Sequence, residues 1–563
     1  MMKEQNKMDG KSIQERVKEF IETTSAHGCG QIPTAKFKLT KFLWGLTFLS
    51  FFTFATVSSG ILIAKYFTYP TKDVVSIEFG NIEFPAVTFC SLQPITITSL
   101  IDFRQNPPPP GHSVSNMIYV MQNIRNIIID RDIGGLGQWY LKHFDRFLSN
   151  QFIFENGEEN DMEQFIHDLR SFKLGCKFQG QVCNGTSFVL HKDGGFHNCF
   201  TFNGAGSDLS NVNIVRTDPA SGLSLVLFMD AYAKGKSVSA YTIYNPDDPT
   251  SGQTGVRAVI HSPRTRPMPF DKGFDIPTGL STSVALKETK RELMTQPHNN
   301  CTNDEFNQGT NYSYSVDTCY EQCQQDLLIE ECGCKSSLLI PPSFDKSDLE
   351  YCGKVNITNM MLMMNQNDDI TQSIAEKELE NLDCEEGVMY SFGNLAILEQ
   401  CACKDHCQTI NYVKTISQAV WPNDNAQEAF YDTYVNRTDQ TLRPNKLFKG
   451  YNTSEIINND MIHKNFLRLN IYFESLYVET TSEVEDYPAG TLISEIGGNM
   501  GFYVGISIIT LMEIFCITGA IILYCFKDWL IKCGHMNKTK VSHVNVKPVE
   551  LDGDSTEKIK DKY

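Results

Sequence analysis

Two apolar segments near the ends of the chain constrain its fold more than any other feature of the sequence. Residues 42–64 form a run of 23 without a charged side chain, and a helix needs about 20 apolar residues to cross a bilayer core. A second apolar segment covers 488–526 and is closed by Lys527. The first segment is longer than the apolar part of a signal peptide, about 7–15 residues. The sequence therefore predicts two transmembrane helices, at 42–64 and 488–526.

Basic residues predict the orientation of both segments. Lysines precede the first segment and follow the second, at Lys36, Lys38, Lys41, Lys527, Lys532, Lys538 and Lys540. Because the cytosolic flanks of membrane spans carry the excess of Lys and Arg, we expect 1–41 and 527–563 to be cytosolic. The 423 residues 65–487 are then extracellular, in a multi-pass protein of the plasma membrane.

Cysteines and glycosylation signals support an extracellular middle segment. Fourteen of the 18 cysteines lie between the apolar segments, an even number that predicts disulfides in an oxidising compartment. Cys29, Cys516, Cys525 and Cys533 are expected to stay reduced. Six N-x-S/T sequons are candidate glycosylation sites: Asn184, Asn300, Asn311, Asn356, Asn436 and Asn452. The net charge of −18 argues against a nucleic-acid partner.

The extracellular segment predicts a mixed α+β domain. Residues 65–90 and short β-rich runs within 176–287 indicate strands. The stretch PPPPG at 107–111 predicts a loop, and apolar residues recur at helical spacing over 117–128. After Cys301 the chain is cysteine-dense and partly helical.

Two pairs of cysteines have a spacing that suggests a ladder. Cys319 and Cys323 lie about 6 Å apart along one face of a helix, and Cys401 and Cys403 lie about 6.6 Å apart if extended. A helix antiparallel to that segment could be cross-linked as Cys319–Cys403 and Cys323–Cys401, although spacing alone does not establish these pairs. Such a stiff rod could carry movement towards the membrane; the alternative is plain stabilisation of a large extracellular domain.

No catalytic or cofactor motif is present. The sequence lacks H-E-x-x-H, G-x-S-x-G and G-x-x-x-x-G-K-[ST], so we predict neither an enzyme nor a cofactor. The cluster Cys401, Cys403, His406 and Cys407 has metal-ligand composition. We expect its cysteines to form disulfides outside the cell, and no metal site is predicted.

The second apolar segment keeps carboxylates that a simple anchor would lack. Glu495 and Glu513 are 18 residues apart, about 27 Å and five whole turns on an unbroken helix, so they would share one face. Carboxylates inside a membrane usually face a protein interior or water. The alternative is that both lie at the interfaces and reach the headgroups.

Glycines recur every four residues in the same segment, at Gly497, Gly501 and Gly505. They suit either close approach of helices or a break that lets backbone carbonyls line a water-filled path. The stretch Gly505-Ile506-Ser507 suits a break, and its carbonyl and hydroxyl oxygens suit Na⁺. One such helix cannot enclose a pore, so several subunits are expected.

Four motifs carry a resemblance along nearly the whole chain. They are His27-Gly28, Phe84–Cys90 (FPAVTFC), Cys199–Asn203 (CFTFN) and Glu495–Phe515 (EIGGNMGFYVGISIITLMEIF). Each is similar to a signature of the degenerin/epithelial sodium channel superfamily. The resemblance implies a homotrimer, or a heterotrimer with related subunits, whose extracellular domain has a palm and β-ball core with knuckle, finger and thumb. It also implies permeant Na⁺ and block of the pore by amiloride.

The resemblance also implies roles for individual residues. It makes Gly505, Ile506 and Ser507 the selectivity filter and His27-Gly28 a gating motif. Ser494 takes a position where bulky substitutions hold such channels open. The pore and gate residues are then Ser494, Glu495, Gly498, Gly501 and Glu513. The family's seven-bridge pattern implies the disulfides Cys90–Cys199, Cys176–Cys183, Cys301–Cys407, Cys319–Cys403, Cys323–Cys401, Cys332–Cys384 and Cys334–Cys352.

The stimulus is where the chain departs from the family pattern. Similar acid-sensing members often have a histidine pair shortly after the first span, and Pro70-Thr71 stand there in this chain. This difference favours the peptide-gated invertebrate branch, with an extracellular neuropeptide as ligand. Constitutive or mechanical gating is an alternative, as is proton gating through acidic clusters at Asp345, Asp348, Glu350, Asp383, Glu385 and Glu386.

A rival from another class has the same topology. A two-span scavenger-type receptor, or an ecto-enzyme anchored at both ends, would carry a large disulfide-rich domain without a pore. Either would tolerate a featureless second span. Glu495, Glu513 and the glycines therefore favour a channel.

Overall fold

The computed structural model describes residues 13–26, 28–80, 82–106, 163–209, 212–214, 216–235, 252–306, 312–341, 348–352, 368–393, 395–437 and 439–538. His27, the expected helix at 117–128, Asp345 and the sequons Asn311 and Asn356 lie outside these ranges. The chain divides into two compact units, Met1–Thr71 with Glu485–Tyr563, and Lys72–Val484.

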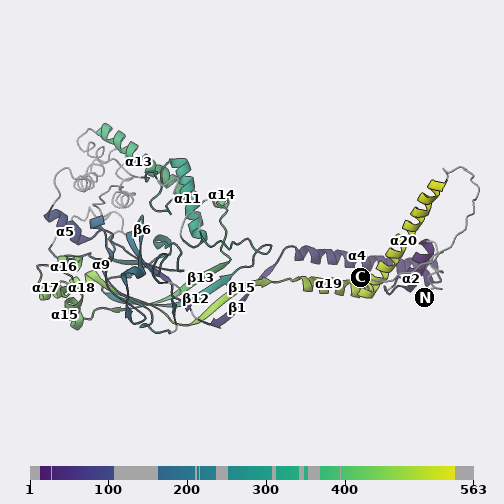
Figure 1. Ribbon diagram of the computed structural model, residues 1–563, viewed down its shortest axis with the longest axis horizontal. Coiled ribbons are helices and arrows are strands. Elements are labelled where there is room, and N and C mark those ends of the chain that lie inside the picture. Colours follow the sequence, from purple (N-terminus) through teal and green to yellow (C-terminus); the bar gives the residue numbers. More distant parts are fainter. Residues whose placement is uncertain are drawn as a thin grey trace, which may run out of the picture. The chain divides into compact units, whose positions relative to one another are not determined.

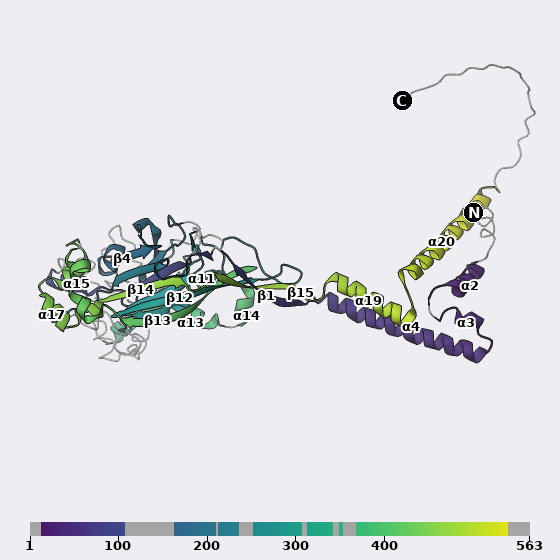
Figure 2. The ribbon, with the colours of Figure 1, turned by 90° about the horizontal axis from the view of Figure 1, so that it is seen from below.

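The unit that contains both chain ends is helical. It comprises α2 (Ile13–Thr23), α3 (Gln31–Thr34), α4 (Lys38–Tyr66), α19 (Ala489–Val504) and α20 (Ile508–Lys538). The stretches Lys38–Tyr66 and Ile508–Phe526 are each long and apolar enough to cross a membrane. The second apolar segment differs from the single helix expected over 488–526, because it is interrupted between α19 and α20. Helix α19 lies alongside α4 (Figures 1 and 2).

The larger unit is built on two antiparallel or mixed sheets. The first has the strand order β1-β15-β12-β14-β9-β4-β5, with β13 also paired to β12. Its strands are β1 (Thr71–Phe79), β15 (Tyr477–Glu485), β12 (Leu280–Glu292), β14 (Phe466–Phe473), β9 (Leu223–Phe228), β4 (Lys173–Phe178), β5 (Gln181–Val182) and β13 (Gln408–Val420). Strand β12 runs parallel to β14 and β15 and antiparallel to β13. The strands expected within 176–287 are therefore confirmed.

The second sheet has five strands in the order β11-β10-β3-β7-β6. They are β11 (Phe274–Pro277), β10 (Gly255–His261), β3 (Ala86–Ser91), β7 (His197–Phe202) and β6 (Phe188–Asp193). A separate pair joins β2 (Ile82–Glu83) to β8 (Asn213–Ile214). One buried core draws on both larger sheets, with Phe89 and Phe202 from the second packed in the same cluster as Leu225 and Leu286 from the first.

Two of the family-like motifs meet in this core. FPAVTFC supplies β3 and CFTFN supplies β7, and the two strands pair directly. Thr88 and Thr201 share a 2.8 Å hydrogen bond across the pair, and the Asn203 amide donates to the Phe84 carbonyl oxygen at 2.6 Å. Buried polar groups need such partners because an unpaired one is costly. These motifs therefore stabilise the fold.

Helices of different lengths lie beside the sheets (Figure 1). They include α5 (Ile97–Gln105), α9 (Leu169–Phe172), α10 (Pro269–Lys272), α11 (Val316–Cys332), α13 (Asp368–Ser391), α14 (Leu395–Gln400), α15 (Gln427–Tyr431), α16 (Arg443–Phe448), α17 (Thr453–Asn458) and α18 (Met461–Asn465). Helix α11 begins at a Ser315 N-cap and ends at Gly333 in the left-handed region. Both ends follow the usual capping preferences.

Seven disulfides cross-link the larger unit. Their Cα–Cα distances run from 4.3 Å for Cys90–Cys199 to 5.9 Å for Cys319–Cys403 and Cys332–Cys384. The other pairs are Cys176–Cys183, Cys301–Cys407, Cys323–Cys401 and Cys334–Cys352. All seven are the pairs that the resemblance implies. The four described sequon asparagines, Asn184, Asn300, Asn436 and Asn452, are exposed.

Candidate pore segment

The second apolar segment is broken at the three residues expected to form a filter. Helix α19 ends at Val504, and Gly505 follows with φ 71° in the left-handed region. The Gly505 N–H donates to the Gly501 carbonyl at 3.0 Å, and the Ile506 N–H to the Met500 carbonyl at 3.2 Å. This is the glycine-ended closure common at helix C-termini. The helix break expected at Gly505 is therefore present.

A hydroxyl cap starts the next helix. The Thr510 N–H donates to Ser507 Oγ at 3.3 Å, and the Ser507 N–H donates back to Thr510 Oγ1 at 3.2 Å. Such reciprocal bonds satisfy backbone donors that a helix start leaves without partners. Thr510 is 1% exposed, and sequence reasoning missed it. Its place three residues after Ser507 is a helix-start signal that could have found it.

Glu513 contacts the segment that precedes the first apolar helix. Its Oε2 accepts hydrogen bonds from Thr24 Oγ1 at 3.0 Å and from the Ser25 N–H at 3.1 Å. Ser25 Oγ also lies 2.6 Å from Thr510 Oγ1. A line of hydroxyls thus joins Ser25, Thr510 and Ser507, so the N-terminal segment reaches the break. Sequence reasoning had not associated Thr24 or Ser25 with this site.

The following turn contains the described half of the His27-Gly28 motif. Gly28 has φ 85°, a backbone conformation that side chains with a Cβ rarely adopt. An ideal Cβ there would come within 3.9 Å of the Phe48 ring and 4.0 Å of the Trp44 ring, both on α4. The glycine thus permits the chain to turn closely against the first membrane helix.

The remaining expected gate residues lie along α19. Ser494, Glu495 and Gly498 are exposed in the single chain, and Gly501 is partly buried. The Tyr487 hydroxyl donates to the Glu495 carboxylate. The break means that Glu495 and Glu513 are not on one straight helix, so the five-turn spacing expected of them does not apply. An ideal Cβ at Gly497 or Gly498 would meet no atom within 4 Å, so packing against α4 does not require these glycines.

Helix α19 is positioned by polar and aromatic contacts with α4. The Asn499 amide donates to Ser58 Oγ at 3.0 Å; inside a membrane, a hydrogen bond between helices is worth about 0.6–2 kcal/mol. Tyr503 packs with its ring centroid 4.8 Å from that of Phe54 and 6.2 Å from that of Phe51. Neither Asn499 nor Ser58 was among the expected site residues.

The expected cysteine ladder is present in the larger unit. Cys319 and Cys323 on α11 bond to Cys403 and Cys401. The 401–403 segment is a turn, with Ala402 at φ 50°, rather than the extended segment assumed from the spacing. All three cysteines of the Cys401, Cys403, His406 and Cys407 cluster are in disulfides, so they supply no thiolate to a metal.

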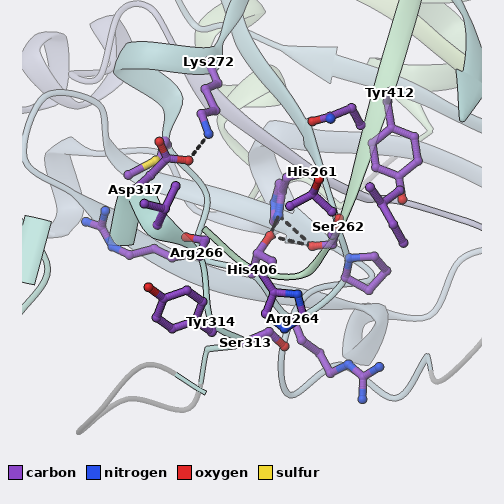
Figure 3. A pocket seen from close by; sticks show the side chains of 18 of the residues that line it. His261, Ser262, Arg264, Arg266, Lys272, Ser313, Tyr314, Asp317, His406 and Tyr412 are labelled. Carbon is purple, nitrogen blue, oxygen red and sulfur yellow. Dashed lines mark hydrogen bonds and ion pairs between the residues drawn. The ribbon is translucent and has the colours of Figure 1, made fainter. Parts of the chain in front are cut away.

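A cavity of about 860 Å³ lies beside the first turn of α11. Its walls come from the end of β10 and the loop that follows, from α10, and from residues 405–414. Figure 3 shows Lys272 paired with Asp317, and His261 beside Ser262. His261 Nδ1 also lies 2.9 Å from the Thr265 hydroxyl. Burial and the nearby Glu288 and Glu83 hold the pKa of Tyr412 well above its usual range. The lining carries both signs of charge, as at Lys272 and Asp317, beside apolar side chains such as Ile260.

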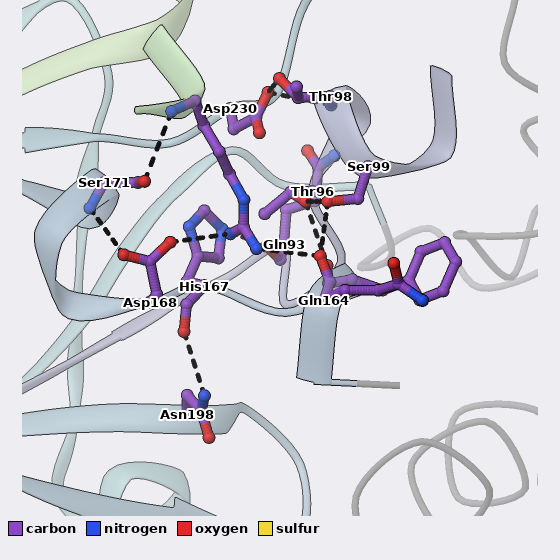
Figure 4. A network of polar contacts seen from close by, with 12 residues as sticks. Gln93, Thr96, Thr98, Ser99, Gln164, His167, Asp168, Ser171, Asn198 and Asp230 are labelled. Atoms are coloured by element: carbon purple, nitrogen blue, oxygen red, sulfur yellow. Dashed lines mark hydrogen bonds and ion pairs between the residues drawn. The ribbon is translucent and has the colours of Figure 1, made fainter. Parts of the chain in front are cut away.

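A buried polar network includes Thr96 and Thr98 at the start of α5 (Figure 4). Asp230 is 0% exposed, and its Oδ1 accepts from the Thr98 N–H at 3.1 Å and the Thr98 hydroxyl at 2.7 Å. Burial raises the pKa of Asp230 to about 6, against the opposing effects of Thr98 and Arg443. His167, nearby, has its pKa lowered by burial to about 3. At neutral pH His167 is thus uncharged.

Comparison with known proteins places these features in context. A sequence model described as "Amiloride-sensitive sodium channel" matches residues 20–517. The chain is 28% identical to the "FMRFamide-activated amiloride-sensitive sodium channel" of Cornu aspersum, over 90% of this chain and 83% of that protein. It is 25% identical to "Acid-sensing ion channel 2" of Danio rerio, over 84% and 76%. It is 26% identical to "Degenerin-like protein unc-105" of Caenorhabditis elegans, over 64% and 36%.

Proposed function

Because this chain belongs to the amiloride-sensitive sodium channel family, we propose that its second apolar segment lines a sodium-selective pore that an extracellular peptide opens. The observation that carries the proposal is the break at Gly505–Ser507. A receptor that needed only an anchor would have no use for a helix interrupted inside an apolar segment. Irregular backbone at membrane depth is tolerated where it lines a cavity or is buried in protein.

The break supplies oxygen atoms for a hard cation. A helix end leaves its last carbonyls without helical partners and carries partial negative charge. Near the break, the carbonyls of Gly505 and Ile506 and the hydroxyl of Ser507 are candidate Na⁺ ligands. Ser507 Oγ already accepts from the Thr510 N–H, so its position is held by the cap rather than left to rotate.

One chain cannot surround an ion, so the pore needs several copies. We propose a trimer, of this chain alone or with related subunits, with both termini in the cytosol of a cell whose plasma membrane it crosses twice. Ser494, Glu495, Gly498 and Gly501 would face one another near the axis. Two observations support this: Gly497 and Gly498 have open space at the Cβ position, and Ser494 is exposed in the single chain.

The proposed stimulus rests on the printed name of one relative and on the pKa values of buried histidines and Asp230. The relative that matches over nine-tenths of this chain is named for activation by FMRFamide. Burial lowers the pKa of His167, His191 and His197 to about 3 and that of His261 to about 4. These histidines stay neutral in mild acid and so do not favour proton gating. Asp230, whose pKa is about 6, is the observation that keeps proton gating as a second candidate.

Expression of this chain alone tests the proposal. Whole-cell current is recorded during application of FMRFamide, acid steps and stretch, each with and without amiloride. We expect an amiloride-blocked current after the peptide, with a reversal potential that follows the Na⁺ gradient when Na⁺ is replaced by a large organic cation. Equal Na⁺ and Cl⁻ permeability, or surface protein without current under any stimulus, would contradict the channel.

A further inference from the structure

Helix α11 is held on two opposite faces by two different kinds of contact. Cys319 and Cys323 bond it to Cys403 and Cys401. Asp317 and Glu321 pair it with Lys272 and Arg266, which lie in and just before α10. Each set is spaced by four residues and so occupies one face. The sets are offset by two residues, about 200° around the helix, which places them on opposite sides.

The two faces differ in how readily they can separate. A disulfide holds its partners at a fixed distance, whereas an ion pair can open without breaking a covalent bond. The Arg266–Glu321 pair is the more enclosed, with side chains 5% and 15% exposed, while Lys272 and Asp317 are 55% and 38% exposed. Any turning of α11 that keeps the disulfides intact therefore strains the charged face first.

The groups around Glu321 have opposing effects on the pKa of its carboxyl in the Arg266–Glu321 pair. Burial raises the pKa of the Glu321 carboxyl, Arg266 lowers it, and the carboxylates of Asp271 and Asp193 raise it further. Arg266 is also close enough to lower the pKa of the buried His191. The Arg266 guanidinium thus acts on both Glu321 and His191.

The structure also has space beside the charged face. Ser315, Val316 and Asp317 from the start of α11 line the cavity of about 860 Å³, as do Arg266 and Lys272 (Figure 3). The far end of α11 is tied to α13 by Cys332–Cys384 and by Leu328 packed with Val388. The start of the helix thus borders open space, and its far end is linked to α13.

We propose that the Arg266–Glu321 and Lys272–Asp317 pairs form a latch that opposes a pivot of α11 about its disulfide face, and that this pivot accompanies channel opening. The inference rests on the proposed function, in which an extracellular ligand opens the pore. The latch residues are positioning residues, since they contact neither the ion nor the pore. A latch that opposes the pivot makes opening harder, so weakening it must make opening easier.

Variants that neutralise one charge of an ion pair test whether weakening the latch makes the channel easier to open. Asp317→Asn and Lys272→Gln each remove one charge from the exposed pair, and we expect the half-maximal FMRFamide concentration to fall by about twofold. Glu321→Gln should lower it by about three- to tenfold because its pair is largely buried. The swap Lys272→Asp with Asp317→Lys should restore the original value. Asp275→Asn is the matched control, because it breaks the Arg257–Asp275 pair between β10 and β11 without touching α11.

Open probability in single-channel records without ligand gives a second readout. The latch predicts a higher ligand-free open probability in the neutral variants. It predicts a normal open probability in the charge-swapped double variant and in Asp275→Asn. Unchanged or raised half-maximal concentrations at normal surface expression would overturn the latch, as would failure of the swap to restore them. If Glu321→Gln does not reach the surface, the exposed pair carries the test. If the unmodified chain ignores FMRFamide, the proposed ligand is wrong, and ligand-free open probability alone decides the latch.

Discussion

Gly505→Ala tests the proposed selectivity filter at a residue whose backbone conformation disfavours any side chain with a Cβ. Gly505 has φ 71°, and a side chain with a Cβ pays about 1–2 kcal/mol to occupy the left-handed region. In one subunit that shifts the local equilibrium about 5- to 30-fold. In a trimer the three costs sum to about 3–6 kcal/mol. The backbone around Ile506 should then rearrange, and its carbonyls should no longer match Na⁺.

The assay compares permeability with assembly. Na⁺ over K⁺ permeability is obtained from reversal potentials with one cation on each side, and surface trimers are counted in the same cells. For Gly505→Ala we expect a lower Na⁺ over K⁺ permeability ratio, or no current, at normal surface expression. Gly519→Ala is the control: it lies inside α20, an ideal Cβ there meets nothing within 4 Å, and alanine there should stabilise the helix by about 0.5–1 kcal/mol. A permeability ratio unchanged by Gly505→Ala would move the filter elsewhere.

Four further predictions address other parts of the chain. Ser507→Ala removes the proposed pore oxygen and the helix cap, so it should also change selectivity; an unaltered Na⁺ over K⁺ permeability ratio in ion substitution would contradict this. Ser494→Cys modified from outside by a bulky charged thiol reagent should lock the channel open, and full closure after modification would remove Ser494 from the gate. Replacing Cys319 together with Cys403 should weaken the stimulated current per surface trimer; a normal current per trimer would leave that disulfide as scaffold alone. Burial lowers the pKa of His167, His191 and His197 from 6.5 to about 3. Between these two pH values the histidines therefore bind protons in the unfolded chain but not in the folded one. Stability to heat should therefore fall as pH falls through this range, by up to about 1.4 kcal/mol per pH unit for each histidine, and His197→Asn should make the decline shallower.

Local chemistry explains why part of the site could be predicted. Hydropathy alone locates a membrane span, because the bilayer imposes one length and one polarity on any helix that crosses it. The cysteine count predicts a disulfide framework because an oxidising compartment pairs thiols. Gly505 and Ser507 predict a helix break because glycine permits backbone conformations that other residues rarely adopt. These inferences need only neighbouring residues. The specific disulfide pairs came from the resemblance, not from spacing.

Contacts between distant segments are what only the tertiary structure decided. Glu513 accepts from Thr24, which lies 489 residues away in the sequence, and no local pattern marks either residue as the other's partner. The opposed faces of α11 became visible only when Arg266 and Lys272 were placed beside it. The burial of His197 likewise depends on how the sheets pack around it. The sequence by itself determined which segments could enter a membrane and which thiols could pair, because those properties belong to short stretches of chain. The tertiary structure decided which charges, hydroxyls and rings meet, because such contacts arise only when the whole chain has folded.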